Sequence, residues 1–162
     1  MVVDCQALAE IVNGGSPLSD DNYVPMFRRI ASSLAQLLCQ DWRPARDCDD
    51  PVEWRMREWN RQADFVVNEA MDSGAAMEWS DLVLLSNACY RNVLVFSDGG
   101  LRRPSGRAAA GWVAYVREDA GFRMMAYAAQ PLGGVASAFA AEAIALEMAV
   151  SFLVTLAMRR NQ

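Results

Sequence analysis

The chain has 162 residues, of which 53% are hydrophobic and 22% charged, and its formal net charge at pH 7 is -5. This length suits one domain with a core of its own, and the composition excludes a disordered chain and a disulfide-stapled miniprotein. The acidic balance gives no overall attraction for a phosphate backbone and weakens any contact with nucleic acid. We therefore expect a packed, soluble protein.

The cysteine pattern indicates reduced thiols. The cysteines lie far apart, form no C-x-x-C pair, and have no histidine in the chain to complete a zinc site. The N-terminus shows no basic segment followed by an apolar one, which is the pattern of a secretory signal. We expect buried thiols and an intracellular protein. The residues concerned are Cys5, Cys39, Cys48 and Cys89.

The most membrane-like segment runs from Val135 to Met158. Glu142 and Glu147 interrupt it, and acidic residues at the centre of a bilayer are costly. We expect a buried helix here and no membrane partner.

The first part of the chain alternates strand-like and helical segments. Helices are expected where apolar residues recur three and four positions apart, and strands where short apolar runs end at turn residues. In chain order, the pattern predicts a strand over Met1–Val3, helices over Cys5–Asn13 and Val24–Cys39, a polar loop over 40–51, a short strand over Val52–Met56, and a helix over Arg61–Met71 that ends before Gly74.

The second part of the chain predicts three antiparallel strands and one long helix. The stretch 73–91 has weak helical character around Leu82 to Leu85, and since no single period holds across it, we interpret it as a connection. The apolar run and alternating segments after it are typical of a central strand followed by a hairpin. The expected strands are Val93–Phe96, Ala109–Arg117 and Phe122–Ala129, and the helix is Val135–Arg159.

Four acidic residues occupy positions that acids normally avoid. Asp4 and Asp98 directly follow apolar strands, Asp64 lies at the start of a predicted helix, and Glu142 shares an apolar helical stripe with Leu146 and is expected to face the sheet. Singly, each acid has an ordinary interpretation as a helix-terminal, turn or surface residue. Together they form a candidate site for two Mg²⁺ ions, which prefer carboxylate oxygens.

Two segments of the C-terminal half resemble the first part of a ribonuclease H domain, especially of the kind attached to retroelement reverse transcriptases. VLVFSDGGLRRPSGRAAAGWVAYV, residues 93–116, is similar to the family's first two strands, with Asp98 in the place of the first catalytic acid. AAEAIALEMAV, residues 140–150, is similar to the family's first helix, with Glu142 in the place of the second acid.

Two segments of the N-terminal half resemble the remainder of the same domain. VVDCQALAEIVNG, residues 2–14, is similar to the fourth strand and its following helix, with Asp4 as the third acid and Cys5 where serine is usual. REWNRQADFVVNEAM, residues 57–71, is similar to the closing segment of the family, with Asp64 as the fourth acid. This last match is the most specific in the chain.

The two halves stand in reverse order, so the resemblance implies a circularly permuted domain. Residues 1–72 resemble the family's C-terminal half, 73–91 form the new connection, and 92–162 resemble the N-terminal half. The expected fold is α/β and ribonuclease H-like, with a mixed five-stranded sheet of three antiparallel and two parallel strands flanked by helices. Met1 to Asp4 should then pair in parallel with Val93 to Asp98.

The resemblance implies a hydrolase, an endonuclease that cuts the RNA strand of RNA/DNA hybrids to leave 5′-phosphate and 3′-hydroxyl ends. Its cofactor would be two Mg²⁺ ions, or Mn²⁺ in their place, held by Asp98, Glu142, Asp4 and Asp64. Contacts to the RNA 2′-hydroxyls would come from Gly99, Gly100 and Gln6.

Some features depart from the family, and alternatives stay open. The family's loop histidine is absent because the chain contains none. Where the family often has polar residues that touch the substrate ahead of the helix glutamate, this chain has Ala138, Phe139 and Ala140. One alternative is a catalytically weak or inactive module, derived from a retroelement, that keeps the fold and a metal for nucleic-acid binding or structure. Another is an α/β domain with purely structural acids. We favour a closed monomer over a dimer that exchanges halves, and a fragment of a tandem array is also compatible.

Six arginines could bind phosphate groups of the substrate or simply form a solvated surface, and the sequence favours neither interpretation. They are Arg102, Arg103, Arg107, Arg55, Arg57 and Arg61.

Overall fold

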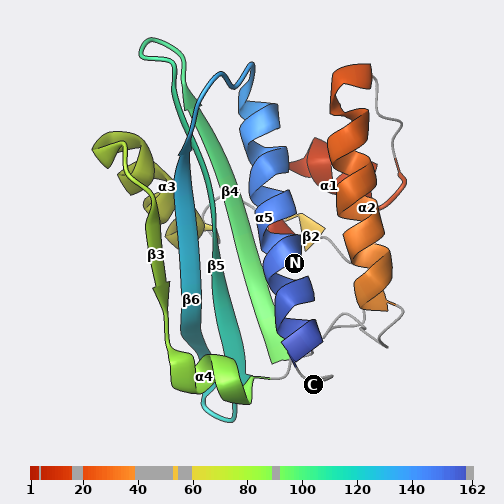
Figure 1. Cartoon of the computed structure of the whole chain (residues 1–162), viewed down its shortest axis with the longest axis vertical. Coiled ribbons are helices and arrows are strands. Elements are labelled where there is room, and N and C mark those ends of the chain that lie inside the picture. Colours follow the sequence, from red (N-terminus) through yellow and green to blue (C-terminus); the bar gives the residue numbers. More distant parts are fainter. Residues whose placement is uncertain (4, 16–19, 39–52, 55–59, 89–91, 160–162) are drawn as a thin grey trace.

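The computed structural model describes residues 1–3, 5–15, 20–38, 53–54, 60–88 and 92–159 (Figure 1). Helices and strands alternate in the first half, and three long strands precede the long helix of the second. The elements are β1 (Val2–Val3), α1 (Gln6–Val12), the short 3₁₀ helix η1 (Asp21–Tyr23), α2 (Val24–Leu38), β2 (Glu53–Trp54), α3 (Arg61–Ser73), β3 (Met77–Ser80), α4 (Leu82–Asn87), β4 (Val93–Arg102), β5 (Arg107–Glu118), β6 (Gly121–Leu132) and α5 (Ala138–Met158).

The strands form one mixed sheet in the order β2-β1-β4-β5-β6-β3. β1 pairs in parallel with β2 and with β4, and Val2 lies opposite Phe96. β4, β5, β6 and β3 follow in antiparallel pairs. The predicted parallel pairing of the N-terminal strand with the strand that leads to Asp98 is therefore confirmed for the described residues.

The stretch interpreted as a plain connection contains two elements of its own. Met77–Ser80 forms β3, which adds a sixth strand beside β6 at the edge of the sheet. Leu82–Asn87 forms α4, whose first turn is capped by the Asp81 carboxylate, which accepts hydrogen bonds from the Val83 and Leu84 amides. The weak helical character noted around Leu82 to Leu85 agrees with α4. The strand β3 was not predicted, because its pairing with β6 leaves no local signal in the sequence.

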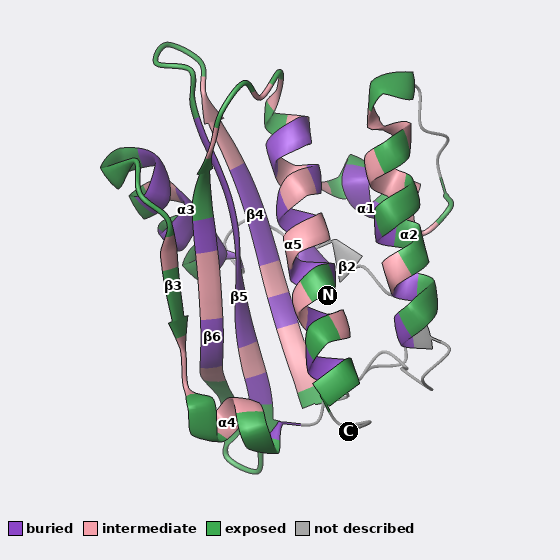
Figure 2. Ribbon diagram, viewed as in Figure 1, coloured by how far each residue is buried: buried purple, intermediate pink, exposed green. Residues whose placement is uncertain are grey.

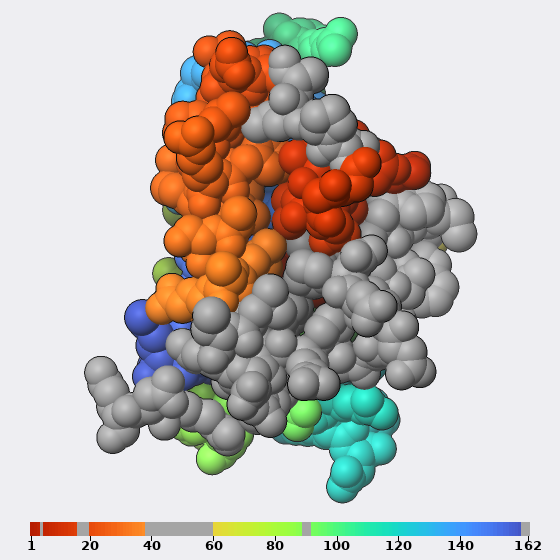
Figure 3. All heavy atoms as spheres, turned by 90° about the vertical axis from the view of Figure 1, so that its right-hand side faces the viewer, coloured from red at the N-terminus to blue at the C-terminus, as the bar shows by residue number. Residues whose placement is uncertain are grey.

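Helices cover both faces of the sheet (Figure 1). α3 packs against β4, β5 and β6 on one face, and α5 packs against β4 and β5 on the other. α2 lies outside α5, and Figure 3 shows it on the surface beside the N-terminal residues that include α1. Burial is concentrated on the central strands and on the helix faces turned toward them (Figure 2). The sheet thus carries two separate apolar clusters, one on each face.

α5 is the core helix of the larger cluster. Its N-terminus is capped by Ser137, whose hydroxyl accepts from the Ala140 amide at 3.1 Å. The helix is long and apolar enough to cross a membrane by length and composition, but 50% of that span is buried inside this fold. The predicted helix is thus present, and the side of it that packs on the sheet is buried.

Candidate functional site

Asp98 lies in β4 and is a buried acidic residue, with 4% of its surface exposed. Because side chains alternate along a strand, Asp98 shares a face with Phe96 and Gly100. That face is turned toward α3, since a Cβ atom added at Gly100 would lie 2.8 Å from Met71 Cε and 3.6 Å from Val67 Cγ1. Asp98 therefore belongs to the α3 side of the sheet.

Gly99 is turned to the opposite face and is the point where α5 meets β4. A Cβ atom added at Gly99 would lie 2.2 Å from the carbonyl carbon of Ala141 and 2.3 Å from the backbone nitrogen of Glu142. No side chain fits in that space, so the helix backbone rests directly on the strand backbone. This contact brings the backbone of Glu142 to the residue that follows Asp98.

Glu142 lies in the second turn of α5 and is half-buried, with its Oε2 atom withdrawn from solvent. The stripe predicted to face the sheet is buried beyond it, at Leu146, Ala149 and Leu153. The neighbouring acid, Glu147, instead forms an ion pair with Arg29 of α2. The prediction that Glu142, unlike Glu147, is directed toward the sheet agrees with this packing.

Asp64 lies in the first turn of α3 and is half-buried. Its amide donates to the carbonyl of Asn60 at 3.0 Å, and its own carbonyl accepts from Asn68 Nδ2 at 2.8 Å. Ala63 and Val67 share one side of the helix and are fully buried against the sheet. Asp64 is therefore on the border between the buried and exposed faces of α3.

Asn60, directly before α3, fixes the start of this helix to β4. Its side chain is 1% exposed, and its Nδ2 donates to the carbonyl oxygen of Ser97 at 2.9 Å. Ser97 immediately precedes Asp98, and Asp64 follows Asn60 by one helical turn. The bond therefore joins the two chain segments that carry two of the candidate acids.

The fourth candidate acid, Asp4, lies outside the described residues. Among the residues that are described, no three Asp, Glu, Cys or His side chains gather into a group that could hold a metal ion. The oxygen donors of Asp98, Glu142 and Asp64 nevertheless fit a hard cation such as Mg²⁺ in their chemistry. The metal-ligand set of Asp98, Glu142, Asp4 and Asp64 remains a prediction.

The residues predicted to contact substrate have different surroundings. Gln6 is exposed at the start of α1 and donates from Nε2 to Glu10 Oε1 at 2.8 Å. Gly99 is buried beneath α5, and Gly100 is half-buried beneath Met71 of α3. Close backbone packing accounts for Gly99, whereas at Gly100 an added Cβ would meet only side-chain atoms. The contacts of both glycines with substrate stay predictions.

The arginines that were predicted to contact phosphate differ in their ion pairs, hydrogen bonds and exposure. Arg102 forms an ion pair with Asp72 of α3 and donates to Asn68 Oδ1 at 3.1 Å. The hydrogen bond from Arg102, together with its charge, lowers the pKa of the Asp72 carboxyl. Arg61, Arg103 and Arg107 are exposed. Arg55 and Arg57 lie outside the described residues, and their phosphate contacts stay predictions.

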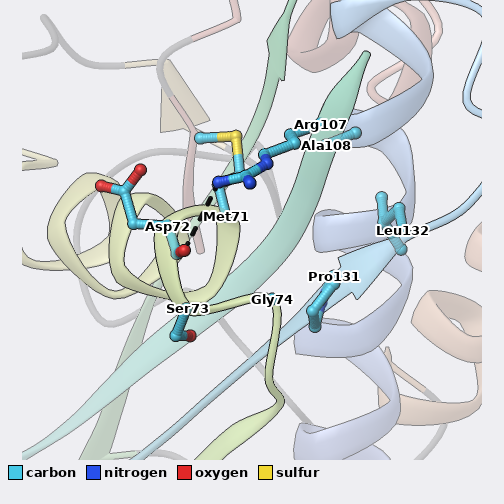
Figure 4. A pocket seen from close by; sticks show the side chains of 8 residues that line it. All are labelled: Met71, Asp72, Ser73, Gly74, Arg107, Ala108, Pro131 and Leu132. Carbon is cyan, nitrogen blue, oxygen red and sulfur yellow. Dashed lines mark hydrogen bonds between the residues drawn. The ribbon is translucent and has the colours of Figure 1, made fainter. Parts of the chain in front are cut away.

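A shallow pocket lies at the far end of α3, away from Asp64 (Figure 4). Its volume is about 190 Å³, and Arg107 crosses it to donate to the backbone carbonyl of Asp72 at 3.5 Å. Of the described candidate acids, Asp64, Asp98 and Glu142, none lines this pocket. Its walls are Met71, Asp72, Ser73, Gly74, Arg107, Ala108, Pro131 and Leu132.

Cys5 bears on the expectation of buried reduced thiols. It is a thiol at the N-cap of α1 and is partly buried. Cys39, Cys48 and Cys89 lie outside the described residues.

The sequence pattern gave no sign of a role for Asn60, although its spacing from Asp64 puts both residues on one side of the helix start.

Comparison of the chain with protein-family models, with curated proteins and with solved structures finds no match in any of the three.

Proposed function

We propose that this chain is a Mg²⁺-dependent endonuclease that hydrolyses the RNA strand of RNA/DNA hybrids, on a ribonuclease H-like fold with its halves in permuted order. The observation that carries the proposal is the packing around β4. Asp98 is buried in that strand. The backbone of α5 at Glu142 packs on Gly99, the residue after Asp98. Asn60, four positions before Asp64, donates to the carbonyl of Ser97, the residue before Asp98.

The strand order supports the permuted arrangement. A strand from the start of the chain lies in parallel beside the strand that carries Asp98, with Val2 opposite Phe96. Asp4 and Asp98 each follow their member of this pair by two positions in the sequence. The proposal assigns Asp4 to the same site on that spacing.

In the proposed reaction, the four carboxylates hold the cofactor and the protein frame holds the carboxylates. Divalent ions bound there supply Lewis-acid activation of water and stabilisation of the leaving oxygen. Asp98 contributes a carboxylate whose direction is fixed by burial within a strand. Glu142 and Asp64 contribute carboxylates from helices that are packed against opposite faces of that strand. The products would carry 5′-phosphate and 3′-hydroxyl ends.

The test is cleavage of an RNA/DNA hybrid labelled on the RNA strand, with Mg²⁺ or Mn²⁺. Single-stranded RNA, double-stranded RNA and a DNA duplex of the same sequence serve as controls. We expect cleavage of the hybrid alone, abolished by a chelator. Absence of cleavage at high protein concentration would contradict the proposal, and binding of the hybrid without cleavage would favour the binding-module alternative.

A further inference from the structure

Asn60 does not do what an asparagine at a helix start usually does. A side-chain oxygen at this position normally accepts a hydrogen bond from an amide in the first turn. The Asn60 side chain makes no such bond, although the residue is the N-cap of α3. It donates instead to Ser97 in β4, 37 positions away in the sequence.

Two buried polar atoms are left at this junction. Asn60 Oδ1 and Ser97 Oγ are both withdrawn from solvent and have no hydrogen-bond partner within the described part of the chain. Buried acceptors normally find a partner, and a side-chain oxygen at the N-cap normally stabilises a helix start. Among the described residues, Asn60 forgoes that cap bond in favour of its bond to β4.

Local sacrifices of this kind are expected where function sets the geometry. The bond from Asn60 Nδ2 at 2.9 Å holds the carbonyl of the residue before Asp98. The carbonyl of Asn60 itself accepts from the Asp64 amide at 3.0 Å. One residue thus links the backbone on which Asp98 stands to the helical turn on which Asp64 stands.

We propose that Asn60 is a positioning residue that sets the separation of Asp64 from Asp98 and thereby the affinity of the site for its divalent ions. This inference rests on the proposed function. It assigns Asn60 no contact with substrate: the residue acts through the two carboxylates. Its removal should therefore affect metal use and turnover rather than binding of the hybrid.

The test compares Asn60→Ala with Asn87→Ala in α4. Asn87 is a matched control because its Nδ2 also donates to a backbone carbonyl, that of Val83 in its own exposed helix at 2.9 Å. A second control, Val150→Ala, removes buried volume from α5 two turns beyond Glu142 and lowers stability without touching the junction. All rates are measured at a temperature where circular dichroism shows every variant folded.

For Asn60→Ala, we expect kcat on the hybrid to fall about 10- to 100-fold, since small misplacements of reacting groups have effects of this size. The Kd for Mg²⁺, measured by titration calorimetry on the protein without hybrid, should rise about 10- to 100-fold, the range known for residues that orient metal ligands, and the Mg²⁺ concentration for half-maximal rate should rise with it. KM for the hybrid should change by less than about twofold, as expected when binding is untouched. Both control variants should keep the parent's Mg²⁺ requirement.

Equal Mg²⁺ requirements for Asn60→Ala and the parent protein, with kcat lowered no more than in Val150→Ala, would overturn the inference and leave the proposed function intact. If the parent protein itself cleaves no hybrid, the proposed function fails, and the inference fails with it. The two failures are thus distinguished by the activity of the parent protein alone.

Discussion

Gly99 has no room for a side chain. The atoms that a Cβ would meet belong to the backbone of α5, which cannot rotate away as a flexible side chain can. The identity of this residue is thus set by the approach of a helix that carries a candidate acid. The sequence pattern Asp-Gly-Gly indicated a strand end, but only the structure shows that the first glycine is a packing requirement.

Gly99→Ala is therefore expected to destabilise the protein by at least about 3 kcal/mol, the upper part of the range for overpacked cores. Gly133→Ala is the control, because an added Cβ at Gly133 meets no atom within 4 Å. Urea unfolding followed by circular dichroism measures both. A Gly99→Ala variant as stable as the parent would mean that α5 does not rest on β4 as described.

At the residue scale, the sequence suggested the candidate acids, because a carboxylate after an apolar strand, at a helix start or inside an apolar helix is conspicuous. The role of Asn60 was not suggested, since an asparagine before a helix has an ordinary explanation as a cap. Its bond to Ser97 depends on how α3 lies on the sheet, which no local pattern specifies.

At the scale of elements, α3 is fixed to β4 at both ends. Asn60 holds its start to Ser97, and the ion pair between Asp72 and Arg102 holds its last turn to the end of the strand. The sequence pattern predicted the helix, and the structure shows its buried side at Ala63, Val66 and Val67. The sequence contained no signal for β3, because a four-residue edge strand forms only when β6 is beside it.

The ion pair at the end of α3 gives a dependence of stability on pH. Arg102 lowers the pKa of Asp72 in the folded state, so the pair stabilises the fold above the unfolded pKa of about 3.9. That stabilisation is lost as the pH falls through the lower folded pKa. The parent should therefore lose more stability than Arg102→Ala between pH 7 and pH 3, and Arg103→Ala should behave like the parent. Thermal unfolding at a series of pH values measures this, and identical pH profiles for all three would contradict it.

At the scale of the whole molecule, the first strand of the chain is an interior strand of the sheet. β1 lies between β2 and β4, and Val3 is fully buried. The alternation of apolar and turn residues predicted most of the elements, and their reversed order relative to the resembled family predicted which strands meet. The sixth strand and the position of α2 over α5 depended on tertiary packing, which the pattern does not encode.

The permuted arrangement that we propose predicts that the chain tolerates being reopened. A variant that begins at Arg91, joins Gln162 to Met1 through a short Gly/Ser linker and ends at Tyr90 should fold as a monomer, with a stability within about 2 kcal/mol of the parent. A variant opened between Trp112 and Val113, inside buried β5, should not fold. Light scattering and urea unfolding test both. A reopened chain that does not fold, or that folds only as a dimer, would contradict a closed permuted domain.

The central claim is that four acids from distant parts of the chain act at one site. The most direct measurement compares initial rates of RNA cleavage in a hybrid for the parent, Asp98→Asn, Glu142→Gln, Asp64→Asn and Asp4→Asn, with Glu78→Gln on exposed β3 as the control. We predict a loss of at least about 100-fold for each of the four and an unchanged rate for the control, as expected when each removes a ligand of the catalytic ions. Full activity in any of the four variants, or no cleavage by the parent, would contradict the account.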